Sequence, residues 1–283
     1  MTDLRESGGI SAGGAESRPP LLAAENLVVR HHGAPTPTVR GVSFELREGE
    51  CLGLVGASGC GKSTLARALV GLGIVEGGRV LWRGREVAAL SHTDMRAFRS
   101  QVQMVFQDAS GALDRRMTVG AAIEEPLLVF FRRKFPTRAA RRARVAKLLE
   151  RVELPPDLAS RYPHELSGGQ RQRVGIARAL AAEPRALLAD EPLSALDVAV
   201  QAQLLRTLSR LLRETGLAML FVSHDLAVVR CLCPRAMVMA RGVIVESGPV
   251  EELFTAPRAQ FTRELLDAVP RLRTEPNATE ARL

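Results

Sequence analysis

One stretch decides the fold, Gly56-Ala57-Ser58-Gly59-Cys60-Gly61-Lys62-Ser63-Thr64, because it matches the phosphate-binding pattern G-x-x-x-x-G-K-[ST]. Apolar residues 51–55 before it predict a short buried strand, and the apolar spacing of residues 65–72 after it predicts a helix. Glycines let backbone N–H groups turn inward, and the helix N-terminus adds positive potential for phosphate. We therefore expect this loop to bind a nucleoside triphosphate, with Lys62 neutralising the β- and γ-phosphates and Ser63 ligating Mg²⁺.

Composition excludes several classes of protein. The 283 residues are 46% hydrophobic and 25% charged, as in a globular chain with one sizeable core, and no run of 18 apolar residues predicts a transmembrane helix. Residues 1–20 lack the apolar segment of a signal peptide and predict a disordered tail. Four poorly spaced cysteines predict no disulfide framework, which favours the cytoplasm. The net charge of +8 suits an anionic partner, but with one Trp and one Tyr we expect no nucleic acid.

Hydrophobic periodicity predicts alternating strands and helices. Strands are expected at residues 25–30, 42–46, 101–106, 186–189, 218–222 and 236–239, with helices over much of 111–182 and at 198–214. The pair Gly77-Gly78 predicts a turn, followed by a hairpin around Trp82. Strands interleaved with helices predict a mainly parallel sheet.

One helical segment, residues 138–152, carries Arg138, Arg141, Arg142 and Arg144 outside a short apolar stripe. A helix lying on a membrane surface would have this composition. A solvated helix packed on its own domain explains it better, because the apolar stripe is short.

Two acidic residues follow the predicted strand 186–189. Asp190 and Glu191 would lie at the carboxyl edge of the sheet, where α/β proteins bind ligands. We expect Asp190 to coordinate Mg²⁺ indirectly and Glu191 to polarise the attacking water.

A second anion site is predicted at Ser167-Gly168-Gly169-Gln170, after Leu166. Ser167 is a good N-cap, and the two glycines would expose backbone N–H groups at the start of a helix. A helix cap alone would not need two glycines followed by glutamine.

These motifs occur in one order: GASGCGKST, VFQD, LSGGQRQR, LLADEP, SALD and VSHD. In this order the chain resembles the ATP-binding-cassette (ABC) ATPases over about residues 21–250. The resemblance implies an α/β P-loop ATPase with a mainly parallel central sheet, an antiparallel β subdomain and an inserted helical signature subdomain at about 111–182. It also implies that ATP and Mg²⁺ are bound and that ATP is hydrolysed.

The resemblance assigns further roles. Gln107 would contact Mg²⁺ and sense a membrane partner, and His224 would contact the γ-phosphate, so that Glu191, His224, Lys62 and Gln107 form the catalytic set. Residues Ser194 to Asp197 would lie at a dimer seam, where each signature segment caps the other subunit's phosphate-binding loop.

Two positions depart from these expectations or extend them. His31, beside His32, occupies the place where the family usually stacks an aromatic residue on adenine, which puts base selectivity in doubt. Cys60 lies in the phosphate-binding loop, and we expect the helix N-terminus to lower its pKa and make the thiol reactive.

The segment FQD…ALDRRMTV and the tail from Gly248 to Pro270 resemble the ATPase subunits of peptide and nickel importers. This resemblance implies an ATPase domain at 21–253 and a C-terminal extension at 254–283. Its partners would be two permease subunits, a solute-binding protein and a second ATPase subunit, at the cytoplasmic face of the inner membrane. The alternative is the ATPase of a phosphonate carbon–phosphorus lyase complex. A DNA-repair cassette is disfavoured, because only about 105 residues separate Lys62 from Ser167.

Overall fold

The computed structural model describes residues 19–194 and 196–267. Most of the predicted N-terminal tail, the end of the C-terminal extension and Ala195 in the predicted dimer seam lie outside these ranges. Within them, no helix has the length and apolar character needed to cross a bilayer.

The larger sheet has six strands in the described ranges, in the order β10-β9-β3-β8-β7-β6. All neighbouring pairs are parallel except β9 and β10. The carboxyl ends of β3, β8 and β7 therefore meet at one edge, which positions the residues that follow them. The strands are β3 Cys51–Val55, β6 Val102–Val105, β7 Ala186–Asp190, β8 Ala218–Ser223, β9 Arg235–Ala240 and β10 Val243–Pro249.

The smaller sheet is antiparallel, in the order β2-β1-β4-β5. Its strands are β1 Leu22–Arg30, β2 Val39–Leu46, β4 Ile74–Trp82 and β5 Arg85–Glu86. The predicted hairpin after Trp82 is confirmed by pairing between Trp82 and Arg85.

The predicted turn at Gly77-Gly78 is wrong, because both glycines lie inside β4. Gly78 has φ +69°, and a Cβ there would lie 2.3 Å from the carbonyl oxygens of Glu25 and Asn26. The register between β1 and β4 is irregular at this point. The glycines therefore allow a bulge in β4 and its close approach to β1. A pair of glycines in a sequence fits either a bulge or a turn, so the sequence pattern does not distinguish the two.

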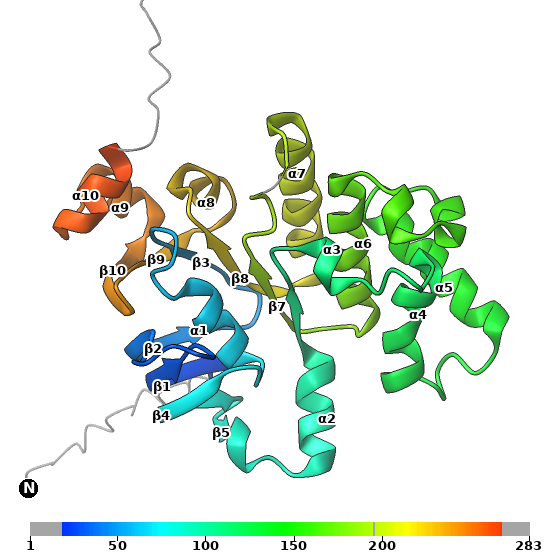
Figure 1. Cartoon of the computed structure of the whole chain (residues 1–283), viewed down its shortest axis with the longest axis horizontal. Helices are drawn as coiled ribbons and strands as arrows, with labels where there is room; N and C mark the ends of the chain where they lie inside the picture. Colours follow the sequence, from blue (N-terminus) through cyan, green and yellow to red (C-terminus); the bar gives the residue numbers. More distant parts are fainter. Residues whose placement is uncertain (1–18, 195, 268–283) are drawn as a thin grey trace, which may run out of the picture.

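Helix α1 contacts strands of both sheets, and Figure 1 shows α3–α6 gathered beyond the β6 edge of the larger sheet. Helix starts follow their capping residues: Thr118, Thr137, Ser167 and Asp197 each accept a backbone N–H of the first turn that follows. The helices are α1 Lys62–Leu69, α2 His92–Gln101, α3 Ala109–Ala112, α4 Val119–Phe130, α5 Arg138–Arg151, α6 Gly168–Ala181, α7 Val198–Thr215, α8 Leu226–Leu232, α9 Val250–Thr255 and α10 Gln260–Asp267.

The core consists of two hydrophobic clusters on opposite faces of the larger sheet. Successive residues of β8 alternate between them: Met219 and Phe221 join the helical cluster, and Leu220 and Val222 join the cluster under the smaller sheet. The predicted fold class, with a parallel sheet, an antiparallel sheet and a helical portion, is confirmed.

Candidate functional site

The phosphate-binding loop connects the carboxyl end of β3 to α1. Two of its glycines have left-handed backbones, Gly59 at φ +77° and Gly61 at φ +112°. Gly61 is the N-cap of α1 and makes no side-chain cap bond, so the first N–H groups of the helix are left for a ligand. A Cβ on Gly56 would lie 2.2 Å from the carbonyl oxygen of Met239, so only glycine fits there.

Two segments that the sequence does not indicate lie against this loop, and one of them is hydrogen-bonded to it. The backbone N–H of Gly242, in the β9–β10 hairpin, donates to the carbonyl of Cys60 at 3.0 Å. The carbonyl of Thr38 lies 3.0 Å from where a Cβ on Gly61 would sit. Gly242 in the Arg241-Gly242 pair predicts a turn, but nothing in the sequence places that turn against the loop, because their contact is long-range.

Lys62 lies at the centre of the site and is only 3% exposed. Its ammonium donates to the carbonyls of Gly56 at 2.9 Å and Ala57 at 3.1 Å. It also lies 3.3 Å from a carboxylate oxygen of Glu191. The side chain is thus held pointing back over the loop, at the place where phosphate oxygens would accept the same hydrogen bonds.

Glu191 brings the predicted catalytic residues together. Its second oxygen accepts a hydrogen bond from the Gln107 amide at 3.0 Å and lies 3.6 Å from Nδ1 of His224. The Glu191 side chain is 10% exposed and that of His224 is 53% exposed, so the group opens to solvent on the histidine side. Glu191 and His224 follow β7 and β8, and Gln107 follows β6, so the parallel sheet explains their convergence.

Asp190 and Ser63 form a pair beside this group. The Ser63 hydroxyl donates to one Asp190 oxygen at 2.8 Å, and the other Asp190 oxygen is buried with no hydrogen-bond partner. Burial raises the pKa of the Asp190 carboxyl, against smaller lowering effects of the Ser63 bond and Arg67. An orphaned carboxylate oxygen next to a hydroxyl fits a hard divalent cation. No cluster of three or more metal-ligating side chains occurs among the described residues, so such a cation would take most ligands from phosphate and water.

The expected lowering of the Cys60 pKa is wrong. The residue is 8% exposed, and burial raises the pKa of its thiol more than Lys62 lowers it. The helix N-terminus lies nearby, but the cost of ionising a buried thiol exceeds its effect.

The signature segment forms a capping box. The Ser167 hydroxyl accepts the backbone N–H of Gln170, and the side-chain oxygen Oε1 of Gln170 accepts the backbone N–H of Ser167. A Cβ on Gly169 would lie 2.5 Å from the side chain of Val200. The capping box therefore accounts for Gln170, and close packing on α7 accounts for Gly169. Neither residue requires an anion site, contrary to our argument from the sequence. Gly168 has room for a Cβ, with Leu196 at 3.7 Å, and stays consistent with backbone exposed for an anion.

The structure does not bring every predicted site residue to the Glu191 group. Among the described residues, no hydrogen bond or ion pair joins the signature segment to the phosphate-binding loop. Asp197 caps α7 by accepting the N–H of Val200 at 3.0 Å, next to Val198, which is 80% exposed. His31 is exposed in the β1–β2 connection, which ends at Thr38 near the loop.

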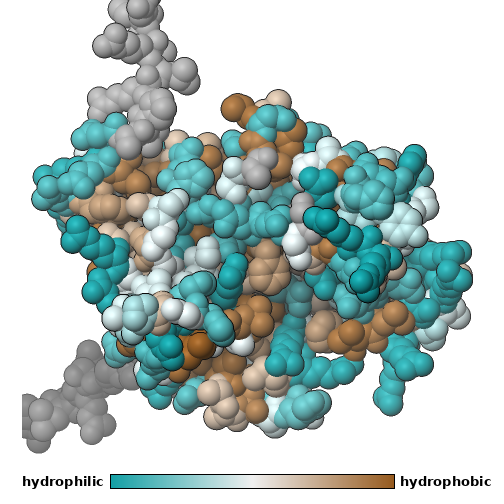
Figure 2. Space-filling view, in the orientation of Figure 1, coloured by the Kyte–Doolittle hydropathy of each residue, from teal (hydrophilic) through white to brown (hydrophobic). Residues whose placement is uncertain are grey.

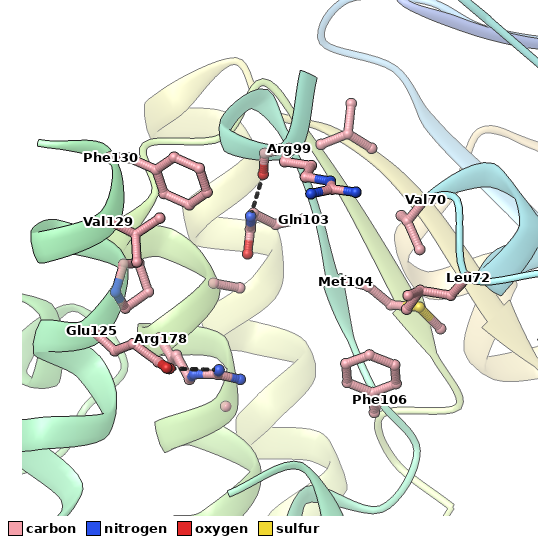
Figure 3. A pocket seen from close by; sticks show the side chains of 14 residues that line it. Val70, Leu72, Arg99, Gln103, Met104, Phe106, Glu125, Val129, Phe130 and Arg178 are labelled. Carbon is pink, nitrogen blue, oxygen red and sulfur yellow. Dashed lines mark hydrogen bonds and ion pairs between the residues drawn. The ribbon is translucent and has the colours of Figure 1, made fainter. Parts of the chain in front are cut away.

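A groove of about 350 Å³ lies next to Gln107, between the sheet edge and the helical portion. An ion pair between Glu125 and Arg178, at 2.8 Å, lies in its wall. Arg96 of α2 donates to the carbonyl of Val129 and so links the two sides. Figure 3 shows apolar side chains on both sides, Val70, Leu72, Met104 and Phe106 facing Val129 and Phe130. Figure 2 shows hydrophobic surface over α4, at the lower right of that face.

Comparisons with known proteins identify the family of this chain. Residues 39–194 match the ABC transporter family. The chain is 48% identical to the oligopeptide transport ATP-binding protein OppF of Escherichia coli (strain K12), over 82% of this chain and 69% of that protein. It is 45% identical to a putative peptide import ATP-binding protein of Brucella ovis, over 89% of this chain and 79% of that protein.

Solved structures show the same fold. The dimeric ATP-binding cassette MJ0796, in a post-hydrolysis state with ADP and Pi, superposes with a TM-score of 0.73 at 29% identity, over 81% of this chain and 98% of that one.

The chain is also 46% identical to the glutathione import ATP-binding protein GsiA of Pectobacterium atrosepticum, over 89% of this chain and 41% of that protein. The chain therefore belongs to the ABC transporter family, as one of its ATP-binding, ATP-hydrolysing members, and is similar to the ATP-binding proteins of peptide importers.

Proposed function

We propose that this chain is the ATPase subunit that powers an importer of peptides. The observation that carries the proposal is the contact of one carboxylate, Glu191, with Lys62, Gln107 and His224. A lysine for phosphate, a base for water and two polar groups around them are the parts that phosphoryl transfer needs.

In this proposal the residues act as follows. The loop N–H groups and Lys62 bind the β- and γ-phosphates of ATP, since anions suit an uncapped helix N-terminus. Glu191 then loses its ion pair with Lys62 to phosphate and is free to accept a proton from the attacking water. Gln107 and His224 orient that water from either side of the carboxylate.

Ser63 and Asp190 would hold Mg²⁺. The ion supplies charge neutralisation at the β- and γ-phosphates when it is bound. Ser63 would ligate it directly, and the orphaned oxygen of Asp190 would accept a hydrogen bond from one of its water ligands.

A second ATPase subunit, identical or paralogous, would complete each site. The signature segment is separate from the Glu191 group within the chain, and Gly168 leaves backbone open at the start of α6. The similar cassette MJ0796 is described as dimeric, which supports the same arrangement here.

The groove beside Gln107 would receive a helix of the permease. Phe106 lines the groove, and the next residue, Gln107, donates a hydrogen bond to Glu191. Phe106 and Gln107 would therefore connect a ligand in the groove to the catalytic carboxylate. Its apolar walls and the exposed Val129 suit an amphipathic helix. This contact would hold the subunit on the cytoplasmic face of the inner membrane.

Peptides are the favoured cargo, because the relatives above are named for oligopeptide, peptide and glutathione import. Nickel or a metal chelate, and the carbon–phosphorus lyase alternative, receive no specific support. Two permease subunits and a solute-binding protein would be the remaining partners, and the binding protein would select the cargo.

The test uses Glu191→Gln. We expect hydrolysis to fall by about 100-fold to 10,000-fold, because the general base is lost, while ATP binding persists. A tagged Glu191→Gln subunit should then capture two permease subunits and a binding protein from native membranes in the presence of ATP.

Val129→Glu provides the matched comparison for the groove. It should abolish capture of the permease and leave ATP hydrolysis by the isolated subunit unchanged, whereas Val245→Glu, at an exposed valine of β10, should change neither. Capture of a soluble lyase complex, or undiminished hydrolysis by Glu191→Gln, would contradict the proposal.

A further inference from the structure

A cavity of about 340 Å³ lies at the amino edge of the larger sheet, opposite the Glu191 group. Its lining comes from three places: the second half of α5, the end of α6 with its connection to β7, and the end of α7 with its connection to β8. Three arginines from two of these elements, Arg144, Arg151 and Arg185, line this one cavity. Nothing in the nucleotide site uses them.

The charges around the cavity do not balance. Glu183 is the acidic residue of the lining, and it is already shared between Lys134, at 2.7 Å, and Arg144, at 3.4 Å. Within the described part of the chain, the guanidinium groups of Arg151 and Arg185 form no ion pair or hydrogen bond. Like charges held around one cavity repel one another unless an anion lies between them.

Arg144 provides a second, independent observation. Its Nε is buried and has no hydrogen-bond partner, although its neighbour nitrogen contacts Glu183. A buried N–H without an acceptor costs free energy, and proteins rarely leave one unless a ligand or water accepts it. Because this nitrogen is shielded from solvent, an oxyanion in the cavity would accept its N–H only if the guanidinium turned toward the cavity.

We propose that this cavity binds a small multivalent oxyanion, one that carries two or more phosphate or carboxylate groups. Arginine forks match both groups in bidentate geometry. The remaining lining is aliphatic and polar, with Leu180, Pro184 and Leu217 and no aromatic ring, so a nucleobase would find no stacking surface. Because α5 belongs to the helical portion and Arg185 leads into β7, the anion would bridge the helical portion and the sheet.

The test is calorimetric titration of the full chain with inorganic pyrophosphate and, separately, with citrate. Wild-type protein should bind two pyrophosphates, one at the phosphate-binding loop and one in the cavity. Arg151→Gln with Arg185→Gln should remove the second site or weaken it by about tenfold or more, since charge-assisted hydrogen bonds are lost. Lys147→Gln with Arg206→Gln removes the same charge from exposed positions outside the lining and should leave both sites intact.

The outcomes separate the source of the ligand and the two proposals. If the cavity binds pyrophosphate more tightly than citrate, its ligand is a polyphosphate. If it binds citrate more tightly, its ligand is a polycarboxylate. A single site in wild type that survives Arg151→Gln with Arg185→Gln would overturn the cavity proposal. A single site lost in that variant would support the cavity and count against the phosphate-binding loop. Should the double variant fail to fold, Arg185→Gln alone, at an exposed residue, repeats the comparison.

Discussion

At the scale of single residues, the carboxyl edge of the larger sheet collects groups that are individually unfavourable. Glu191 has a left-handed backbone at φ +42°, which costs a non-glycine residue on the order of 1 kcal/mol. Asp190 is buried with one oxygen unpaired. Such groups persist where the surrounding structure holds them. Here both carboxylates lie at the end of β7, and β8 holds Glu191 because the Val222 carbonyl accepts its backbone N–H at 3.1 Å.

Asp190→Asn should stabilise the nucleotide-free protein at neutral pH. Burial raises the pKa of Asp190 in the folded state, so ionisation destabilises that state. The free energy of unfolding of the wild-type protein therefore falls as the pH rises through the folded-state pKa. The variant, which cannot ionise, should be more stable by roughly 1 kcal/mol at pH 7.5, and the difference should shrink toward pH 4.

Thermal unfolding at the two pH values measures this effect. Asp157→Asn, at an exposed position, is the control and should show no such dependence. An Asp190→Asn advantage that is equal at both pH values would mean that packing, rather than ionisation, is responsible.

Cys60 should resist alkylation in the native protein. Its thiol is buried and its raised pKa leaves little thiolate, whereas Cys231 is exposed. Limited iodoacetamide treatment followed by peptide mass spectrometry should label Cys231 first and Cys60 only after unfolding. Early labelling of Cys60 would restore the original expectation of a reactive loop thiol.

At the scale of elements, close approach of α6 and α7 fixes the signature segment. Gly169 permits that approach, because any side chain would meet Val200. Ser167 and Gln170 fix the start of α6 through two reciprocal hydrogen bonds between them. The segment that would meet a partner's nucleotide is therefore already ordered within one subunit.

Gly169→Ala should destabilise the fold by about 1 to 3 kcal/mol, because the new methyl overlaps Val200. Val200→Ala should restore most of that loss in the double variant. Gly175→Ala, in the same helix but with open space around its Cβ, should be neutral or stabilising. Denaturant unfolding measures all four proteins, and a Gly169→Ala loss that Val200→Ala does not relieve would contradict the packing argument.

At the scale of the whole molecule, a dimer with shared sites predicts complementation. Gly168→Asp spoils the signature and Lys62→Ala spoils the phosphate-binding loop, so each variant alone should be inactive. In an equal mixture, a two-fold dimer of one copy of each has one complete site, which should restore about a quarter of the wild-type sites. ATPase assays of the mixture and of each variant alone measure this, and an inactive mixture would argue against sites shared between two copies of this chain.

Much of this organisation follows from the sequence. Strands such as β7 and β8 are short apolar runs ended by carboxylates or histidine, and their parallel pairing brings Glu191 and His224 together without further information. Contacts made by backbone across long separations do not follow, such as Gly242 against Cys60 and Gly78 against Asn26. The predicted lowering of the Cys60 pKa is wrong for a related reason. The helix N-terminus can be predicted from the local sequence, whereas the burial of the thiol depends on the whole fold.

The two hydrophobic clusters have a consequence for how this chain can change over generations. Leu148 belongs to one cluster and Leu69 to the other, with the sheet between them. Substitutions at distant, separate sites usually have additive effects. Mutations within the helical cluster can therefore accumulate over generations with little epistasis toward the face that supports the phosphate-binding loop. Mutations in the groove beside Gln107 cannot, because Val102 and Met104 in its lining belong to or pack against the second cluster.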